Sequence, residues 1–126
     1  MPRFALLEHT GAPDDPAGRH FDLLVEAGAA CRTWRLAELP RAGGAAVAAV
    51  ALPPHRLAWL DHESGEVSGG RGFARRVDGG TCEEPAGAAD RADASRCDFA
   101  MSGAMLRGRL VLKAVGNAWE AMLTGQ

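Results

Sequence analysis

The sequence lacks the motifs of several common active sites. Its cysteines, Cys31, Cys82 and Cys97, are odd in number and show no Cys-x-x-Cys spacing, so neither a disulfide framework nor a thiolate zinc site is indicated. No Gly-Lys-Ser or Gly-Lys-Thr accompanies the glycines of "VSGGRG" at 67–72, which argues against a phosphate-binding P-loop. Because no Ser-His-Asp or Cys-His spacing stands out, we infer no covalent nucleophile.

A strong charge imbalance and a long apolar segment are absent as well. The formal net charge is -2, unlike that of proteins that coat nucleic acid, although an enzyme touching one or two phosphates remains compatible with it. The longest apolar run, "AAVAAVAL" at 45–52, is far shorter than the ~20 residues that span a bilayer, and the first ten residues lack a signal-peptide core. We therefore expect a soluble, cytoplasmic protein that does not insert into a membrane.

The size and composition favour one small domain with many turns. A chain of 126 residues can bury its own core and leaves no room for a second ordinary domain, so residues 1–126 are predicted to form a single unit. The 16 glycines and 7 prolines cluster between short apolar runs, as expected for short strands joined by turns.

Seven short apolar runs, each bounded by turn residues, are predicted to form strands. The connections at 26–31 and 115–119 have the composition of tight hairpins, which implies an antiparallel sheet. Strands this numerous must close or stack to hide their edges, so we predict an all-β, mainly antiparallel fold: a compact β-barrel with one or two short helices or loops. The predicted strands cover residues 3–8, 20–26, 31–36, 56–61, 72–77, 107–115 and 118–123.

Two intervening segments are not predicted as strands. The alanine-rich stretch between Pro40 and Pro54 favours a short helix, with a loose crossover as the alternative. Residues 85–95 are small, polar and without a period, and they are predicted to form a mobile loop.

A histidine and an aspartate open the second predicted strand. Side chains two apart in an extended chain share a face, so His20 and Asp22 lie side by side. His9 and His62 stand at the ends of other predicted strands, whereas His55 follows two prolines in an apparent turn and is expected to be solvated. Imidazole and carboxylate together suit Mn²⁺, Zn²⁺ or Fe²⁺. The alternative is a surface histidine beside a capping aspartate.

Seven short motifs follow one another along nearly the whole chain. They are "FALLEH" (4–9), "RHFDLLVE" (19–26), "RTWRL" (32–36), "HRLAWLDHE" (55–63), "VSGGRG" (67–72), "VDGGTCE" (77–83) and "LRGRLVLKAVGNAWEAML" (106–123). Their order resembles that of the 3′-phosphoesterase domain of bacterial DNA ligase D, most closely its small freestanding members. The family pattern near the start is Glu-His, a short loop, then His-aromatic-Asp-aromatic-Arg-Leu-Glu.

The resemblance implies a β-barrel that binds a divalent metal, with Mn²⁺ favoured and Zn²⁺ as the alternative. It implies removal of a terminal ribonucleotide or a 3′-phosphate from DNA 3′ ends in repair, alongside a repair polymerase or ligase. The implied metal ligands are His20, Asp22 and His62, with His9 in the same site. We predict a catalytic set of His9, Asp22 and His62, with Arg71 as a phosphate-binding residue.

Two positions depart from the family pattern. Leu24 stands where the family has an arginine that would bind the phosphate. Glu66 stands where the family has a tyrosine, and the carboxylate of Glu66 would repel a phosphate. A substitute clamp could come from an arginine elsewhere. A catalytically degenerate barrel that binds metal or nucleic acid as an adaptor is therefore the alternative interpretation. The candidate substitutes are Arg19, Arg71, Arg75 and Arg76.

Overall fold

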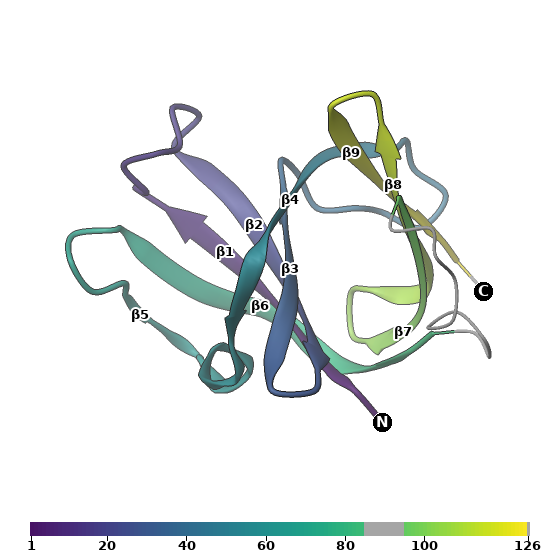
Figure 1. Ribbon diagram of the computed structural model, residues 1–126, viewed down its shortest axis with the longest axis horizontal. Helices are drawn as coiled ribbons and strands as arrows, with labels where there is room; N and C mark the ends of the chain where they lie inside the picture. Colours follow the sequence, from purple (N-terminus) through teal and green to yellow (C-terminus); the bar gives the residue numbers. More distant parts are fainter. Residues whose placement is uncertain (85–94, 126) are drawn as a thin grey trace.

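The computed structural model describes residues 1–84 and 95–125 and shows an antiparallel β-barrel (Figure 1). Within these residues there are nine strands, one 3-10 helix and no α-helix. None of the described residues forms a helix long and apolar enough to cross a membrane. The elements are β1 (Arg3–Thr10), β2 (Arg19–Ala27), β3 (Ala30–Leu36), β4 (Val47–Arg56), η1 (Leu57–Asp61), β5 (Ser64–Glu66), β6 (Phe73–Glu83), β7 (Arg96–Gly103), β8 (Arg107–Val115) and β9 (Ala118–Thr124).

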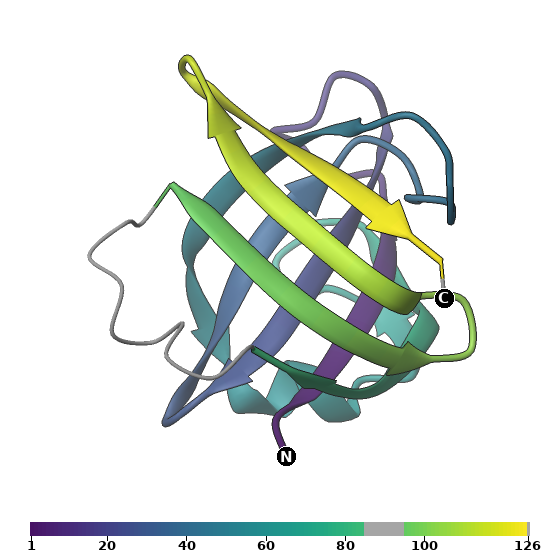
Figure 2. The same ribbon diagram turned by 90° about the vertical axis from the view of Figure 1, so that its right-hand side faces the viewer.

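Eight of the described strands close into a barrel in the order β1-β2-β3-β4-β9-β8-β7-β6, and pairing of β6 with β1 completes the ring. Each pair of neighbours is antiparallel, so the predicted fold class is confirmed. Figure 2 shows β7, β8 and β9 side by side across one wall of the barrel. The short strand β5 lies outside the ring against the first part of β6.

Both predicted hairpins are confirmed. Ala27 pairs with Ala30 across the β2–β3 turn, and Val115 pairs with Ala118 across the β8–β9 turn. Gly116 in the second turn has φ 61°, a left-handed conformation that glycine adopts without steric cost.

Two element predictions were wrong, and strands β5 and β7 were missed. Residues 47–56 form β4 rather than a helix, because Val47 and Ala49 face the core while Ala48 between them faces outward. Residues 57–61 of a predicted strand form η1, which buries Leu60. Strand β7 was not predicted. Of the predicted mobile loop at 85–95, residues 85–94 lie outside the described residues.

Apolar side chains gather on both faces of the sheet. The interior cluster fills the barrel, and the smaller outer cluster lies beneath η1 and the turn after β5. Side chains along β2 alternate between the two clusters: Leu23 faces the interior cluster and Leu24 faces the outer cluster. The interior cluster is Phe4, Leu6, Phe21, Leu23, Val25, Trp34, Leu36, Val47, Ala49, Cys82, Cys97, Phe99, Met101, Leu106, Leu110, Leu112, Ala121 and Leu123. The outer cluster is Ala5, Leu7, Leu24, Cys31, Leu60, Val67 and Ala74.

Candidate metal centre

Three polar side chains interrupt the outer face of β1 and β2. In the β1–β2 ladder His9 pairs directly with His20, and Asp22 pairs with Leu7 of the outer cluster. Cross-strand partners place their Cβ atoms about 5 Å apart, and residue i+2 follows on the same face. The strand register therefore brings both imidazoles and the carboxylate together, on the outer face of the barrel wall.

The ligand atoms of His9, His20 and Asp22 converge. They lie within 4.8 Å of one another, a group that could hold a metal ion. His9 Nδ1 is 3.4 Å from Asp22 Oδ2, and His20 Nε2 is 3.3 Å from Asp22 Oδ1. With ligand distances of ~2.0–2.2 Å, neighbouring donors around one ion are separated by about 2.8–3.6 Å. Both nitrogen-to-oxygen separations fall in this range.

Contacts behind the two imidazoles select which nitrogen faces Asp22. His9 Nε2 is 2.7 Å from the carbonyl oxygen of Arg71. Because this oxygen can only accept a hydrogen bond, Nε2 carries the hydrogen and Nδ1 keeps its lone pair. His20 Nδ1 is 2.7 Å from Asp15 Oδ2, and in the neutral ring this contact leaves the lone pair on Nε2. Histidines that bind metals usually donate a hydrogen bond from the ring nitrogen that does not bind the metal.

The buried polar atoms of the group are short of hydrogen bonds. His20 Nε2 and Asp22 Oδ1 are buried, and neither has a hydrogen-bond partner among the residues that the structure describes. Their 3.3 Å separation is an ion-pair distance without hydrogen-bond geometry. Leaving such atoms unpaired costs about 1–3 kcal/mol each, and a bound cation would satisfy both.

The surrounding charges shift two pKa values. Burial by itself lowers the pKa of His20, but Asp22 and Asp15 outweigh it and raise the pKa above its usual value. The hydrogen bond with His20 is the main reason that the pKa of Asp15 is lowered. An environment that favours a proton on His20 also favours another cation there, so metal and proton compete for the site.

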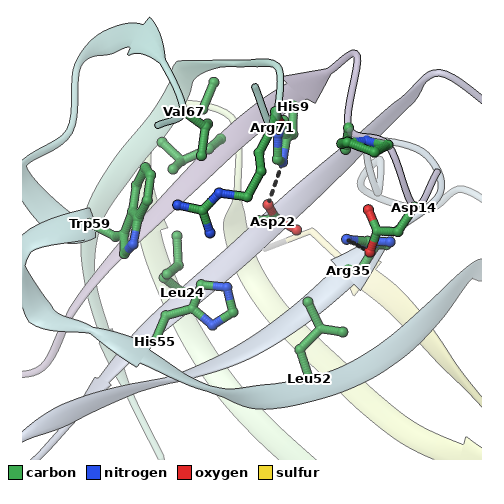
Figure 3. Close-up of a pocket in the computed structure, with 14 residues that line it drawn as sticks. His9, Asp14, Asp22, Leu24, Arg35, Leu52, His55, Trp59, Val67 and Arg71 are labelled. Atoms are coloured by element: carbon green, nitrogen blue, oxygen red, sulfur yellow. Dashed lines mark hydrogen bonds and ion pairs between the residues drawn. The ribbon is translucent and has the colours of Figure 1, made fainter. Parts of the chain in front are cut away.

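A cavity of about 350 Å³ adjoins the group (Figure 3). Figure 3 shows the Arg71 guanidinium reaching over the cavity between Trp59 and Asp22. Arg71 is held there by its own turn, since Nε donates to the carbonyl of Ser68 at 2.7 Å. The lining combines the charged group with apolar walls. The lining residues are Leu7, His9, Ala12, Pro13, Asp14, Asp22, Leu24, Arg35, Leu52, His55, Trp59, Val67, Arg71 and Ala74.

The predicted ligand His62 is not part of the converging group. Its Nε2 lies 2.9 Å from the carbonyl oxygen of Ala74, and its ring packs on Trp59 with centroids 4.9 Å apart. His55, which we expected to be solvated, is half-buried and lines the cavity instead. Its Nδ1 is 2.9 Å from the Pro53 carbonyl, which leaves Nε2 as the nitrogen with the lone pair.

Of the four arginines considered as substitutes for the missing clamp, Arg71 lines the cavity. Arg19 and Arg75 instead form ion pairs with Glu8 at 3.5 and 3.0 Å. Arg76 donates to a backbone carbonyl of η1.

The two departures from the family pattern have different consequences. Leu24 is buried in the outer cluster and forms part of the cavity wall, so this wall is apolar where the family has a cation. Glu66 is exposed and does not line the cavity; it borders a separate hollow at the glycine-rich turn. The expected repulsion of a phosphate by Glu66 therefore does not apply to this cavity.

The sequence did not reveal Asp15 and Arg35 as parts of the site. Asp15 lies in the loop between β1 and β2 and contacts His20. Arg35 lies opposite Asp22 in the β2–β3 ladder and lines the cavity, with its Nη2 3.4 Å from Asp14. The register of β3 could have identified Arg35, but nothing in the loop composition distinguishes Asp15 from Asp14.

No protein-family model and no curated protein matches this chain. What can be stated of the site is therefore its chemistry: a barrel that carries a His/His/Asp group able to hold a metal ion. Two imidazole nitrogens and a carboxylate oxygen form a donor set that suits first-row divalent ions.

Proposed function

We propose that this protein is a metal-dependent phosphoesterase that removes a 3′-phosphate or a terminal ribonucleotide from DNA ends, with Mn²⁺ as the favoured ion and Zn²⁺ as the alternative. The observation that carries the proposal is the convergence of His9, His20 and Asp22 beside a cavity that also holds an arginine. The motif order shared with the ligase D 3′-phosphoesterase domain supports the same activity.

The side chains around the cavity suit hydrolysis of a phosphoester. A divalent ion held by the group would supply a Lewis acid and a bound water of lowered pKa. Arg71 extends over the cavity, where its guanidinium can bind the non-bridging oxygens of a phosphate and stabilise the charge that develops on them. Leu24, Trp59 and Val67 form apolar walls that limit access of bulk water to the reacting group.

The proposed substrate is the end of a nucleic acid rather than its length. One cavity with two lining arginines can bind a single terminal phosphate, and the net charge of -2 does not favour extended phosphate contacts. In this proposal the trimmed 3′-hydroxyl passes to a repair polymerase or ligase in the cytoplasm.

The proposal is tested with purified protein, Mn²⁺ and a primer-template that ends in a 3′-phosphate or one ribonucleotide. We expect trimming by the wild type, none by His20→Ala, and a loss of about 10²–10³-fold in Arg71→Ala. Arg75→Ala is the matched control, because Arg75 carries the same charge on the exposed side of β6 and pairs with Glu8. Wild-type trimming no faster than that of His20→Ala would refute the proposal.

A second candidate function, a metal-containing adaptor without catalysis, is favoured by Leu24. This residue is buried among Leu7, Leu60 and Val67, so the family's arginine cannot be restored there without burying a charge. Arg71→Ala separates the candidates better. An adaptor would bind the DNA end with Mn²⁺ but leave it untrimmed, and loss of Arg71 would change only the affinity.

A further inference from the structure

The loop between β1 and β2 is folded around one carboxylate. Its base is closed by a hydrogen bond from Gly11 N to the Gly18 carbonyl at 3.1 Å, and both glycines have positive φ. Within the loop, Asp15 N donates to the carbonyl of Ala12 and Gly18 N donates to the carbonyl of Asp15. Two successive turns therefore fix the backbone of Asp15.

Both oxygens of the Asp15 carboxylate are engaged. Oδ1 accepts a hydrogen bond from Ala17 N at 3.1 Å, and Oδ2 lies 2.7 Å from His20 Nδ1. The side chain of Asp15 is only 10% exposed, and that of His20 is 3% exposed. The contact is thus short, shielded from water and fixed at both ends.

We propose that Asp15 is a positioning residue that makes Nε2 of His20 a metal ligand. Asp15 accepts the hydrogen of Nδ1 and so holds the neutral ring in the tautomer whose Nε2 lone pair faces Asp22. It also stops rotation of the ring, because a flipped imidazole would lose this hydrogen bond. The inference rests on metal binding in the proposed function and extends it to a residue that would not touch the ion.

The alternative is that Asp15 only anchors the loop through an ion pair with His20. The two roles differ in what removal of the carboxylate changes. A positioning residue alters metal affinity and the identity of the coordinating nitrogen, whereas an anchoring residue alters only the stability of the loop.

The test uses the full-length chain and two variants at Asp15. Zn²⁺ affinity is measured by calorimetry, and ¹⁵N chemical shifts of the Zn²⁺-loaded protein identify the coordinating nitrogen of His20. We expect Asp15→Ala to weaken Zn²⁺ binding about 10–100-fold. Asp15→Asn keeps one amide oxygen that can accept the Nδ1 hydrogen but loses the hydrogen bond from Ala17 N, so it should retain Nε2 coordination and more of the affinity than Asp15→Ala. The control is Asp61→Asn, which removes an exposed carboxylate that contacts Arg3.

The outcomes separate this inference from the proposed function. Unchanged Zn²⁺ affinity in Asp15→Ala, or wild-type coordination through Nδ1, would overturn the role of Asp15 and leave the metal site standing. A wild type that binds neither Zn²⁺ nor Mn²⁺ would overturn both proposals. If Asp15→Ala fails to fold, the ¹⁵N shifts of the Zn²⁺-loaded wild type and Asp15→Asn still decide, because coordination through Nδ1 of His20 in either protein would refute the inference.

Discussion

The two faces of β1 and β2 are built from alternating residues of the same strands, yet they serve different purposes. The inward residues Phe4, Leu6, Phe21 and Leu23 belong to an apolar interior cluster with exposures of 0–1%. The outward residues begin as an apolar layer near Ala5 and end in the His9, His20 and Asp22 group. One face therefore supplies stability, while the other carries two buried polar atoms, His20 Nε2 and Asp22 Oδ1, that lack hydrogen-bond partners among the described residues.

Buried ionisable groups on the two faces differ in whether the charged form is favoured. Inside the barrel, desolvation raises the pKa of the Cys82 thiol to about 11, so Cys82 stays neutral and unreactive. On the outer face, the carboxylates beside His20 reverse the effect of burial and raise its affinity for positive charge. The difference between Cys82 and His20 arises from the neighbouring charges rather than from the extent of burial.

The largest expected effect is loss of metal binding in His20→Ala. Wild-type protein at a Mn²⁺ concentration about 100 times Kd should gain ~2.7 kcal/mol in its free energy of unfolding, because the ion binds the folded state alone. His20→Ala should show no gain. Urea unfolding with Mn²⁺ and with chelator measures both. An equal Mn²⁺-dependent gain in the two proteins would show that the outer face does not hold the ion at this group.

The next effect distinguishes His55 in β4 from His62, which follows η1. His55 lines the cavity, so His55→Ala should reduce the rate of 3′-end trimming about 10²-fold or more through loss of a ligand or proton-transfer group. His62 donates to the Ala74 carbonyl away from the converging group, so His62→Ala should leave the rate within about threefold. Steady-state trimming of a 3′-phosphate primer measures both. A larger loss in His62→Ala would restore the prediction made from the sequence.

The positions of the four predicted site residues show which parts of the site depend on strand register. His20 and Asp22 follow from period two within one strand, and His9 joins them because the β1–β2 hairpin pairs it with His20. The resemblance implied His62 as a ligand, in agreement with its place after a predicted strand at 56–61, but residues 57–61 form η1 and the imidazole contacts the Ala74 carbonyl of β6. A 3-10 helix rises less per residue than a strand, so taking η1 for a strand gives the wrong position for the residue that follows it.

Most strands with alternating large side chains could be predicted from the sequence, but β4 and β7 were missed. Strand β4 contains alanines whose inward and outward positions differ little in hydrophobicity, which hid its period. In β7 the inward residues Cys97, Phe99 and Met101 do alternate, with Asp98 and Ala100 between them, but this short period was overlooked. Contacts with β8 and β6, distant in sequence, decide that these residues pair.

A smaller effect compares two adjacent leucines on opposite faces. Leu23→Ala should lower the free energy of unfolding by about 2–5 kcal/mol, because it opens a void in the interior cluster. Leu24→Ala should cost near the lower limit, about 2 kcal/mol, since one side of Leu24 already borders the cavity and lacks contacts there. Urea unfolding of the metal-free proteins measures both. Equal costs would mean that the outer cluster is packed as tightly as the barrel interior.

The smallest effect contrasts Asp22 with another buried carboxylate, Asp98 on β7, whose neighbours are cations rather than imidazoles. Asp98 lies 2.8 Å from Arg109 and 3.3 Å from Arg96. Burial alone would raise the pKa of Asp98, but the two arginines outweigh it and lower the pKa. The ionised carboxylate therefore stabilises the fold above about pH 4, and this contribution is lost as the pH falls through the lowered pKa.

Asp98→Asn should accordingly cost about 1 kcal/mol or less at pH 7, since Arg109 is largely exposed, and the difference from wild type should shrink toward pH 2. Urea unfolding across this range measures the difference, and Glu66→Gln, which alters an exposed carboxylate on β5, provides the control. Mn²⁺ should stabilise Asp98→Asn as much as wild type, because this carboxylate lies beside Arg96 and Arg109 and is not part of the His9, His20 and Asp22 group. A difference that grows as the pH falls would mean that desolvation, not the arginines, governs Asp98.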